Sequence, residues 1–114
     1  MRQQNIVWIQ FPYSDLQETK VRPGIILSND RYNKVRQDVL VCALTSNLEK
    51  EDYSFFIDAS NLEYGTLPIK SKIRVDKTFL IEKKLILQTF ARLNDRTYDV
   101  LIDILITLIK RRVD

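Results

Sequence analysis

The feature that most constrains the fold is a continuous apolar run in the first half of the chain. Residues Asp38 to Leu44 lack the apolar–polar alternation of a half-exposed strand, since every side chain after Asp38 is apolar. Such a strand is covered on both faces, as in a small barrel. The chain has 114 residues, about the size of one domain, so we interpret residues 1–114 as a single domain with one core.

Further short runs, rich in β-branched and aromatic residues, predict more strands. They are Ile6–Phe11, Gly24–Ser28, Tyr53–Ile57 and Ile69–Asp76. Proline cannot donate to a ladder, so the second of these should begin at or just after Pro23. The fourth alternates, which places Lys70, Lys72, Arg74 and Asp76 on one face of the strand.

The remaining segments are less regular. Asn29–Asn33 fits a turn or one helical turn, Asp58–Gly65 a connection, and Leu80–Leu93 is ambiguous with Leu85–Leu87 as its best strand core. After Asn94 or Asp95 as N-cap, apolar residues from Tyr98 to Leu108 follow helical spacing. The pattern predicts a mainly β protein: five or six mostly antiparallel strands in a barrel-like core, followed by one C-terminal helix packed on it.

Composition narrows the chemistry that the chain can perform. It contains no histidine, so a histidine base or a histidine-ligated metal site is excluded. Cys42 is the only cysteine and lies within the apolar run, which favours a buried thiol and excludes an intramolecular disulfide. No stretch is apolar and long enough for a signal peptide or a spanning helix, so we expect a cytoplasmic protein.

Charge is segregated along the chain although the net charge is only +3. Glu18–Arg36 and Lys70–Lys84 are basic, whereas Glu49–Glu63 is acidic. Such basic segments are consistent with a polyanionic partner, and equally with the solvated face of a small protein.

Several of these segments together resemble the MazF/PemK (Kid) growth-inhibitor toxins. The matching pieces, in the family's order, are Ile6–Pro12, Arg22–Ser28, Val41–Ser46, Ile73–Lys77 and the amphipathic C-terminal helix. Phe11–Leu16, with Lys20 two residues before Arg22, is most similar to the PemK-like branch. The loop at residues 15–19 departs from the family pattern, so the resemblance implies no particular cleavage sequence.

The resemblance implies both a fold and an activity. The fold is an SH3-like barrel that forms a homodimer. The activity is that of a type II toxin–antitoxin toxin, an mRNA interferase that cuts single-stranded RNA at short sequences without a metal or other cofactor. The implied partners are mRNA and an antitoxin whose flexible acidic segment covers the RNA groove. A non-enzymatic toxin similar to CcdB, or a binding module on the same fold, is the alternative.

The resemblance also assigns roles to five residues. Arg22 matches the arginine at the scissile phosphate, and Thr45 the active-site threonine with Ser46 beside it. Arg74 and Asp76 match the acid and base pair of the Kid branch. The bland alternatives are a strand-edge cation for Arg22, a strand-ending turn for Thr45 and Ser46, and a plain surface pair for Arg74 and Asp76.

The residue types themselves are compatible with metal-independent RNA cleavage. Attack of the 2′-OH on the adjacent phosphorus leaves a 2′,3′-cyclic phosphate, and it needs a base and positive charge on the phosphorane. Asp76 is the best proton acceptor in the most basic segment, while Arg74 is a poor proton donor and better suited to stabilising charge. The Thr45 and Ser46 hydroxyls can orient a phosphate or the 2′-OH.

Contacts to the rest of the RNA are predicted from aromatic and basic side chains. Tyr13 lies in a polar stretch and is the best candidate for stacking on a base, whereas Trp8 and Phe11 fit the core better. The lysines assigned to backbone phosphates are Lys20, Lys70, Lys72 and Lys77.

Overall fold

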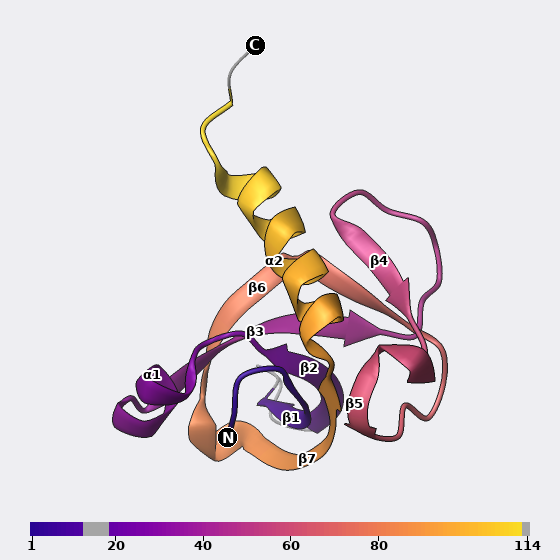
Figure 1. Ribbon diagram of the computed structural model, residues 1–114. Coiled ribbons are helices and arrows are strands. Elements are labelled where there is room, and N and C mark those ends of the chain that lie inside the picture. The colour runs from indigo at the N-terminus through magenta and orange to yellow at the C-terminus, as the bar shows by residue number, and fades with distance from the viewer. Residues whose placement is uncertain (13–18, 113–114) are drawn as a thin grey trace.

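A computed structural model of the protein describes residues 1–12 and 19–112. Its elements are β1 (Asn5–Pro12), β2 (Thr19–Ile26), α1 (Asp30–Val35), β3 (Asp38–Thr45), β4 (Ser54–Ile57), η1 (Ala59–Asn61), β5 (Leu62–Gly65), β6 (Ser71–Glu82), η2 (Lys83–Leu85), β7 (Ile86–Leu93) and α2 (Asp95–Ile109). Within these residues seven antiparallel strands form one sheet in the order β4-β6-β3-β2-β1-β7-β5. The sheet curls into a half-barrel, and α2 crosses it and projects beyond it (Figure 1). The predicted mainly β fold with a C-terminal helix is confirmed.

Apolar side chains are buried on both faces of this sheet. One cluster includes Ile6, Ile25 and Cys42, together with Leu101 of α2. Neighbouring strand residues point the other way and form a second cluster, which includes Val7. The continuous apolar run of β3 contributes to both clusters, as predicted, and burial raises the pKa of the Cys42 thiol.

The C-terminal helix α2 begins where the sequence predicts. The Asn94 side chain accepts a hydrogen bond from the backbone N–H of Thr97 at 2.9 Å, which satisfies one of the free donors of the first turn. The Tyr98 hydroxyl donates to the carbonyl of Leu27 at 2.7 Å and so ties α2 to the end of β2. No helix in the described part of the chain is long and apolar enough to span a membrane.

One predicted boundary in the N-terminal strands is wrong. Strand β2 begins before Pro23, which lies inside the strand opposite Trp8. Proline is tolerated there because β3 pairs with β2 only from Gly24 onward, so no ladder bond is required from Pro23 on that side. The helical turn predicted near Asn29 is present as α1.

The strand count was also underestimated. Residues Leu62–Gly65, predicted as connection, form the short edge strand β5 beside β7. Strand β6 continues to Glu82, and Leu85 belongs to a 3₁₀ turn rather than to a strand core. Short edge strands and 3₁₀ turns carry little apolar periodicity, so their signal in the sequence is weak.

Candidate functional site

A groove of about 540 Å³ opens between β2, the end of β3 and the middle of β6. Five of the residues predicted from the sequence line it: Arg22, Thr45, Lys72, Arg74 and Lys77. They come from three strands that are far apart in the sequence and adjacent in the sheet. The fold therefore brings the dispersed motifs into one place.

An irregularity in β6 shapes one wall of the groove. Cys42 of β3 lies opposite Thr78, but the next residue, Ala43, lies opposite Arg74. Residues 75–77 are thus an insertion in the ladder, a β-bulge that re-aims side chains near the groove. The Thr78 hydroxyl closes the bulge by donating to the carbonyl of Val75 at 2.8 Å.

Arg74 and Asp76 form a two-point ion pair at this bulge. Nε and Nη2 of Arg74 donate to the two carboxylate oxygens of Asp76 at 2.9 and 2.8 Å. These hydrogen bonds lower the pKa of Asp76, and they raise the pKa of Arg74. Asp76 is therefore ionised near neutral pH, and it lies beside the groove on Arg74 without lining the groove itself.

A residue that the sequence analysis missed, Glu51, joins this pair from the β3–β4 loop. One oxygen of Glu51 accepts from Nζ of Lys72 at 3.0 Å, and the other lies 3.1 Å from Nε of Arg74. Nζ of Lys72 also donates to the carbonyl of Glu49 at 2.7 Å. The sequence offered only an acidic segment after the Thr-Ser motif, which does not single out one carboxylate.

Lys72 departs from the expected exposed face of its strand. Its side chain is 1% exposed although it lines the groove, because its ammonium group is turned onto the β3–β4 loop. A phosphate in the groove would find this ammonium already occupied by Glu51. The assignment of Lys72 to a backbone phosphate stays a prediction.

Arg22 and Lys77 are the exposed cations of the groove. The side chain of neither residue makes a hydrogen bond or ion pair with any residue that the structure describes. Their donors are therefore available to an anionic ligand, in contrast to the ammonium group of Lys72.

The two hydroxyl residues at the end of β3, Thr45 and Ser46, have different positions relative to the groove. Thr45 lines the groove, and its Oγ1 accepts from the backbone N–H of Asn47 at 3.1 Å, which leaves the hydroxyl hydrogen to donate elsewhere. Ser46 is exposed and does not line the groove. The motif is thus a strand-ending turn, and its threonine faces the site.

Two other predicted RNA contacts, Lys20 and Lys70, do not line the groove. Lys70 lies over the ring of Phe56, with Nζ 5.5 Å from the ring centre. Lys20 is exposed on β2, opposite Phe11. Tyr13 lies outside the described residues.

Aromatic side chains line the other end of the groove. The rings of Phe11 and Phe79 are tilted against each other with centroids 5.8 Å apart, and both rings line the groove while packing on the second core cluster. Trp8 instead stacks on Phe90 at 4.6 Å. The groove therefore offers an apolar end beside a charged one.

The fold and the groove together define a class: a small curled β-sheet protein with an arginine-lined groove and an Arg–Asp pair at a bulge. A family model described as PemK-like, MazF-like toxin of type II toxin–antitoxin system matches residues 2–109. The chain belongs to this family of toxins.

Solved structures with the same fold cover nearly the entire chain. They include an endoribonuclease in complex with its cognate antitoxin from a mycobacterial species, with 15% identity, a TM-score of 0.79 and coverage of 100% of this chain and 99% of that one. The Mycobacterium tuberculosis toxin MazF-mt6 has 19% identity, a TM-score of 0.75 and coverage of 96% and 99%. The MazE–MazF complex of Deinococcus radiodurans has 16% identity, a TM-score of 0.81 and coverage of 98% of both chains. No curated protein sequence matches the chain.

Proposed function

We propose that this toxin is a metal-independent endoribonuclease, an mRNA interferase that cuts single-stranded cytoplasmic RNA at a short sequence. The observation that carries the proposal is the convergence of Arg22, Thr45 and Arg74 on one groove, with Asp76 held against Arg74. This set supplies a base, a hydroxyl and positive charge without any histidine. The family match supports the toxin role, and one solved structure with this fold is described as an endoribonuclease.

In the proposed reaction Asp76 accepts the proton of the 2′-OH. The 2′-oxygen forms a bond to the adjacent phosphorus as the bond from phosphorus to the 5′-oxygen breaks, and water protonates the leaving oxygen. The products are a 2′,3′-cyclic phosphate and a 5′-hydroxyl end. Hydrogen bonding to Arg74 lowers the pKa of Asp76 and so keeps it in the ionised form that an acceptor needs at neutral pH, while making it a weaker base.

The two arginines share the negative charge that develops on the phosphorane. Arg74 donates two of its five N–H groups to Asp76, so the other edge of its guanidinium remains for a phosphate oxygen. Arg22 binds the phosphate from β2, since its donors have no partner among the described side chains. The hydroxyl of Thr45 orients the 2′-OH or a phosphate oxygen.

The flanking RNA is proposed to follow the exposed cations and the aromatic end of the groove. Lys77 contacts a backbone phosphate, and Phe11 and Phe79 offer ring surface to a base. A DNA strand of the same sequence lacks the attacking hydroxyl, so it should bind without being cut.

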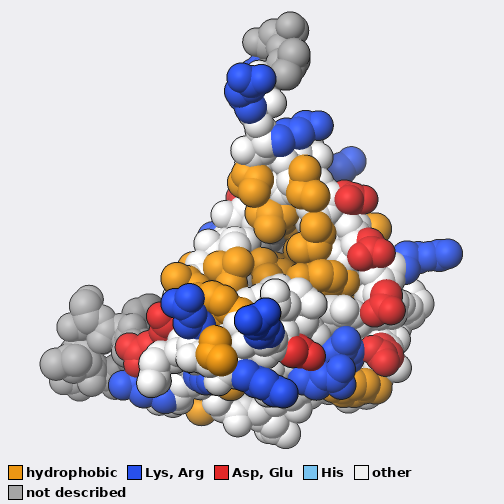
Figure 2. Space-filling view, turned by 60° about the vertical axis from the view of Figure 1, so that its left-hand side comes forward, with side chains coloured by type: hydrophobic (Ala, Val, Ile, Leu, Met, Phe, Trp, Pro, Cys, Tyr) orange, Lys and Arg blue, Asp and Glu red, His pale blue; other side chains and the backbone are white. Residues whose placement is uncertain are grey.

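Two protein partners are also proposed, an antitoxin and a second copy of the chain. An acidic antitoxin segment would complement the cations of the groove, and two of the structural relatives are complexes with an antitoxin or with MazE. Apolar side chains gather along α2 in Figure 2, where Ile106 is 49% and Ile109 70% exposed. Burial of this surface in a homodimer would remove it from water.

The test is cleavage of a mixed-sequence single-stranded RNA by the purified protein in excess EDTA. We expect cuts at a short recurring sequence with 2′,3′-cyclic phosphate ends, and no cuts with Asp76→Ala. Intact RNA after incubation with a folded protein would overturn the proposal. Cleavage that stops in EDTA would overturn the metal-independent mechanism.

A further inference from the structure

The starting observation is the environment of Lys72 in the wall of the groove. Its ammonium group is buried, and its only anionic partner among the described residues is the carboxylate of Glu51. A buried ammonium group without a counter-charge is strongly unfavourable. Lys72 therefore holds Glu51 in place, and with it the β3–β4 loop.

The second observation is what the held carboxylate does with its other oxygen. That oxygen lies 3.1 Å from Nε of Arg74, the edge of the guanidinium that also faces Asp76. Carboxylates from two different segments thus fix one edge of Arg74. The opposite edge, which the proposed mechanism uses for phosphate, is oriented as a consequence.

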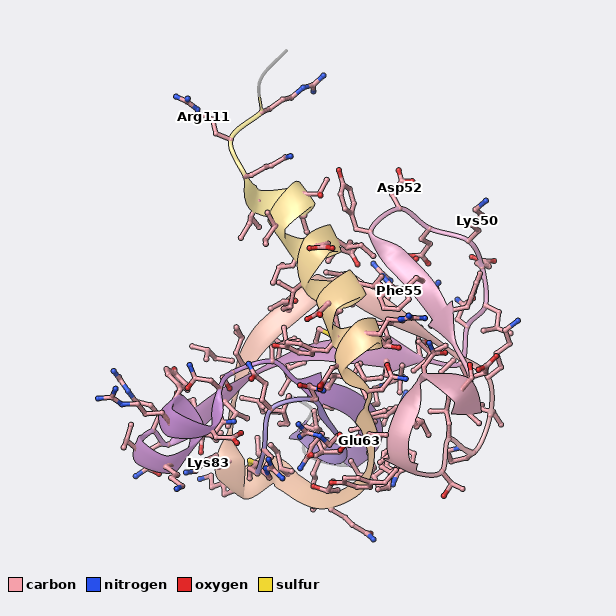
Figure 3. All side chains as sticks on the ribbon, in the orientation of Figure 1. Lys50, Asp52, Phe55, Glu63, Lys83 and Arg111 are labelled. Atoms are coloured by element: carbon pink, nitrogen blue, oxygen red, sulfur yellow. The ribbon has the colours of Figure 1, made fainter. Side chains whose placement is uncertain are left out.

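The neighbours of Glu51 show that this inward placement is specific. Lys50 and Asp52 extend outward from the same loop in Figure 3, and both are exposed. The Glu51 side chain is 32% exposed and that of Arg74 is 21% exposed. Of three successive charged residues, only the middle one reaches the groove.

We propose that Glu51 is a positioning residue, which orients Arg74 for the reaction and is itself held by buried Lys72. This inference rests on the proposed ribonuclease function, because it assigns Glu51 to the turnover step. The rival role is that of a mimic of phosphate, which would occupy Arg74 until RNA displaced it. The two roles predict different effects of removing Glu51. Loss of a positioning residue would slow cleavage, whereas loss of a phosphate mimic would strengthen RNA binding.

The experiment compares Glu51→Gln with Asp52→Asn, which removes a neighbouring exposed carboxylate. For Glu51→Gln we expect kcat for RNA cleavage to fall about 10- to 100-fold, with KM changed less than about threefold. Asp52→Asn should leave both constants at the wild-type values. A lower KM with unchanged kcat for Glu51→Gln would overturn the positioning role in favour of the mimic, and unchanged constants would overturn both.

A double variant separates positioning from folding, because Glu51→Gln alone leaves the Lys72 ammonium buried without its counter-charge. Lys72→Met with Glu51→Gln removes both charges and should restore the thermal midpoint, since apolar replacement of a buried pair is tolerated. Its kcat should stay as low as that of Glu51→Gln. Recovery of the wild-type kcat in the double variant would show that Glu51 serves only to neutralise Lys72, which would overturn the proposal.

A readout without RNA makes the inference independent of the activity. The Nε–H of Arg74 should give a sharp, slowly exchanging signal in ¹⁵N NMR spectra of the wild type and of Asp52→Asn. The signal should broaden or move in Glu51→Gln and in the double variant. If the wild type cuts no RNA but the signal responds in this way, the proposed function fails while the orientation of Arg74 by Glu51 stands. An unchanged signal in both Glu51 variants would overturn the positioning role.

Discussion

Arg22 and Arg74 face the same groove from β2 and β6, but their surroundings are opposite. Arg74 is held by the carboxylates of Asp76 and Glu51, whereas Arg22 is exposed and has no ionic partner among the described residues. A fixed arginine beside a carboxylate suits stabilisation of the proposed transition state, and an arginine without an ionic partner suits capture of a phosphate. The comparison shows that two arginines in one groove can be suited to different steps of a reaction, Arg22 to binding and Arg74 to turnover.

The largest expected effect comes from replacing Asp76, the proposed proton acceptor that is bound to Arg74. Asp76→Asn keeps the shape of the side chain but removes the proton acceptor, so the cleavage rate should fall about 10²- to 10⁴-fold. Single-turnover cleavage of a labelled RNA measures this loss. Asp99→Asn, an exposed carboxylate on α2, is the matched control. A loss of less than tenfold would contradict the assignment of Asp76 as base.

Removing each arginine in turn sharpens the comparison. Arg22→Ala should lower kcat/KM about 10²- to 10³-fold. It should leave the thermal midpoint unchanged, because the described residues offer Arg22 no ion pair to lose. Arg74→Ala should lower activity at least as much and also destabilise the fold by about 1 kcal/mol, allowing for partial exposure, since it leaves Asp76 without its ion-pair partner while Glu51 keeps Lys72.

Cleavage assays and thermal unfolding of both variants check this pair of outcomes. Arg31→Ala, an exposed arginine of α1 away from the groove, controls for the loss of one positive charge. If Arg22→Ala and Arg74→Ala lowered the thermal midpoint equally, the distinction between a fixed and an unpaired arginine would be wrong.

The contrast between the arginines also shows how far the sequence alone could go. The strand and helix periodicities predicted β1, β3, β4 and α2, and the motifs predicted that Arg22, Thr45 and Arg74 matter. Local pattern suffices for these, because each is encoded by spacing within one element or by a short motif.

What escaped prediction depends on contacts between distant elements. The apolar alternation of Ile73 and Val75 is that of a regular strand. It therefore gives no signal of the bulge at residues 75–77. Glu51 meets Lys72 only because β3 and β6 pair, across 21 residues of sequence. A lysine on an alternating strand is expected to be exposed, and here tertiary pairing overrides that expectation.

A smaller effect is expected from the other exposed cation of the groove. Lys77→Gln should weaken RNA binding modestly and reduce the slope of log affinity against log salt concentration by about 0.7, the value for one phosphate contact on a single strand. The measurement is RNA binding by an Asp76→Asn background at several salt concentrations. Lys84→Gln, on an exposed lysine paired with Glu82 away from the groove, should leave the slope unchanged. An unchanged slope for Lys77→Gln would contradict the phosphate contact.

The smallest expected effect is the pH dependence of the folding stability that the Arg74–Asp76 pair contributes. The hydrogen bonds from Arg74 lower the pKa of Asp76 in the folded protein, so their stabilising contribution is complete above the unfolded pKa of about 3.9. It is lost as the pH falls below that value and through the folded pKa. Wild type should therefore be more stable than Asp76→Asn at pH 7 and at pH 5, and the difference should shrink progressively as the pH falls from about 3.9 through the lowered folded pKa.

Urea unfolding of the two proteins at each pH measures this difference. Carboxylates common to both proteins titrate alike and cancel in the comparison, so the remaining pH dependence belongs to the Arg74–Asp76 pair. The same series with Arg22→Ala should run parallel to the wild type, because no described carboxylate is paired with Arg22. If the Asp76→Asn difference persisted undiminished at pH 2.5, the pair would stabilise the fold through shape rather than charge. The contrast between the two arginines would then have to rest on geometry alone.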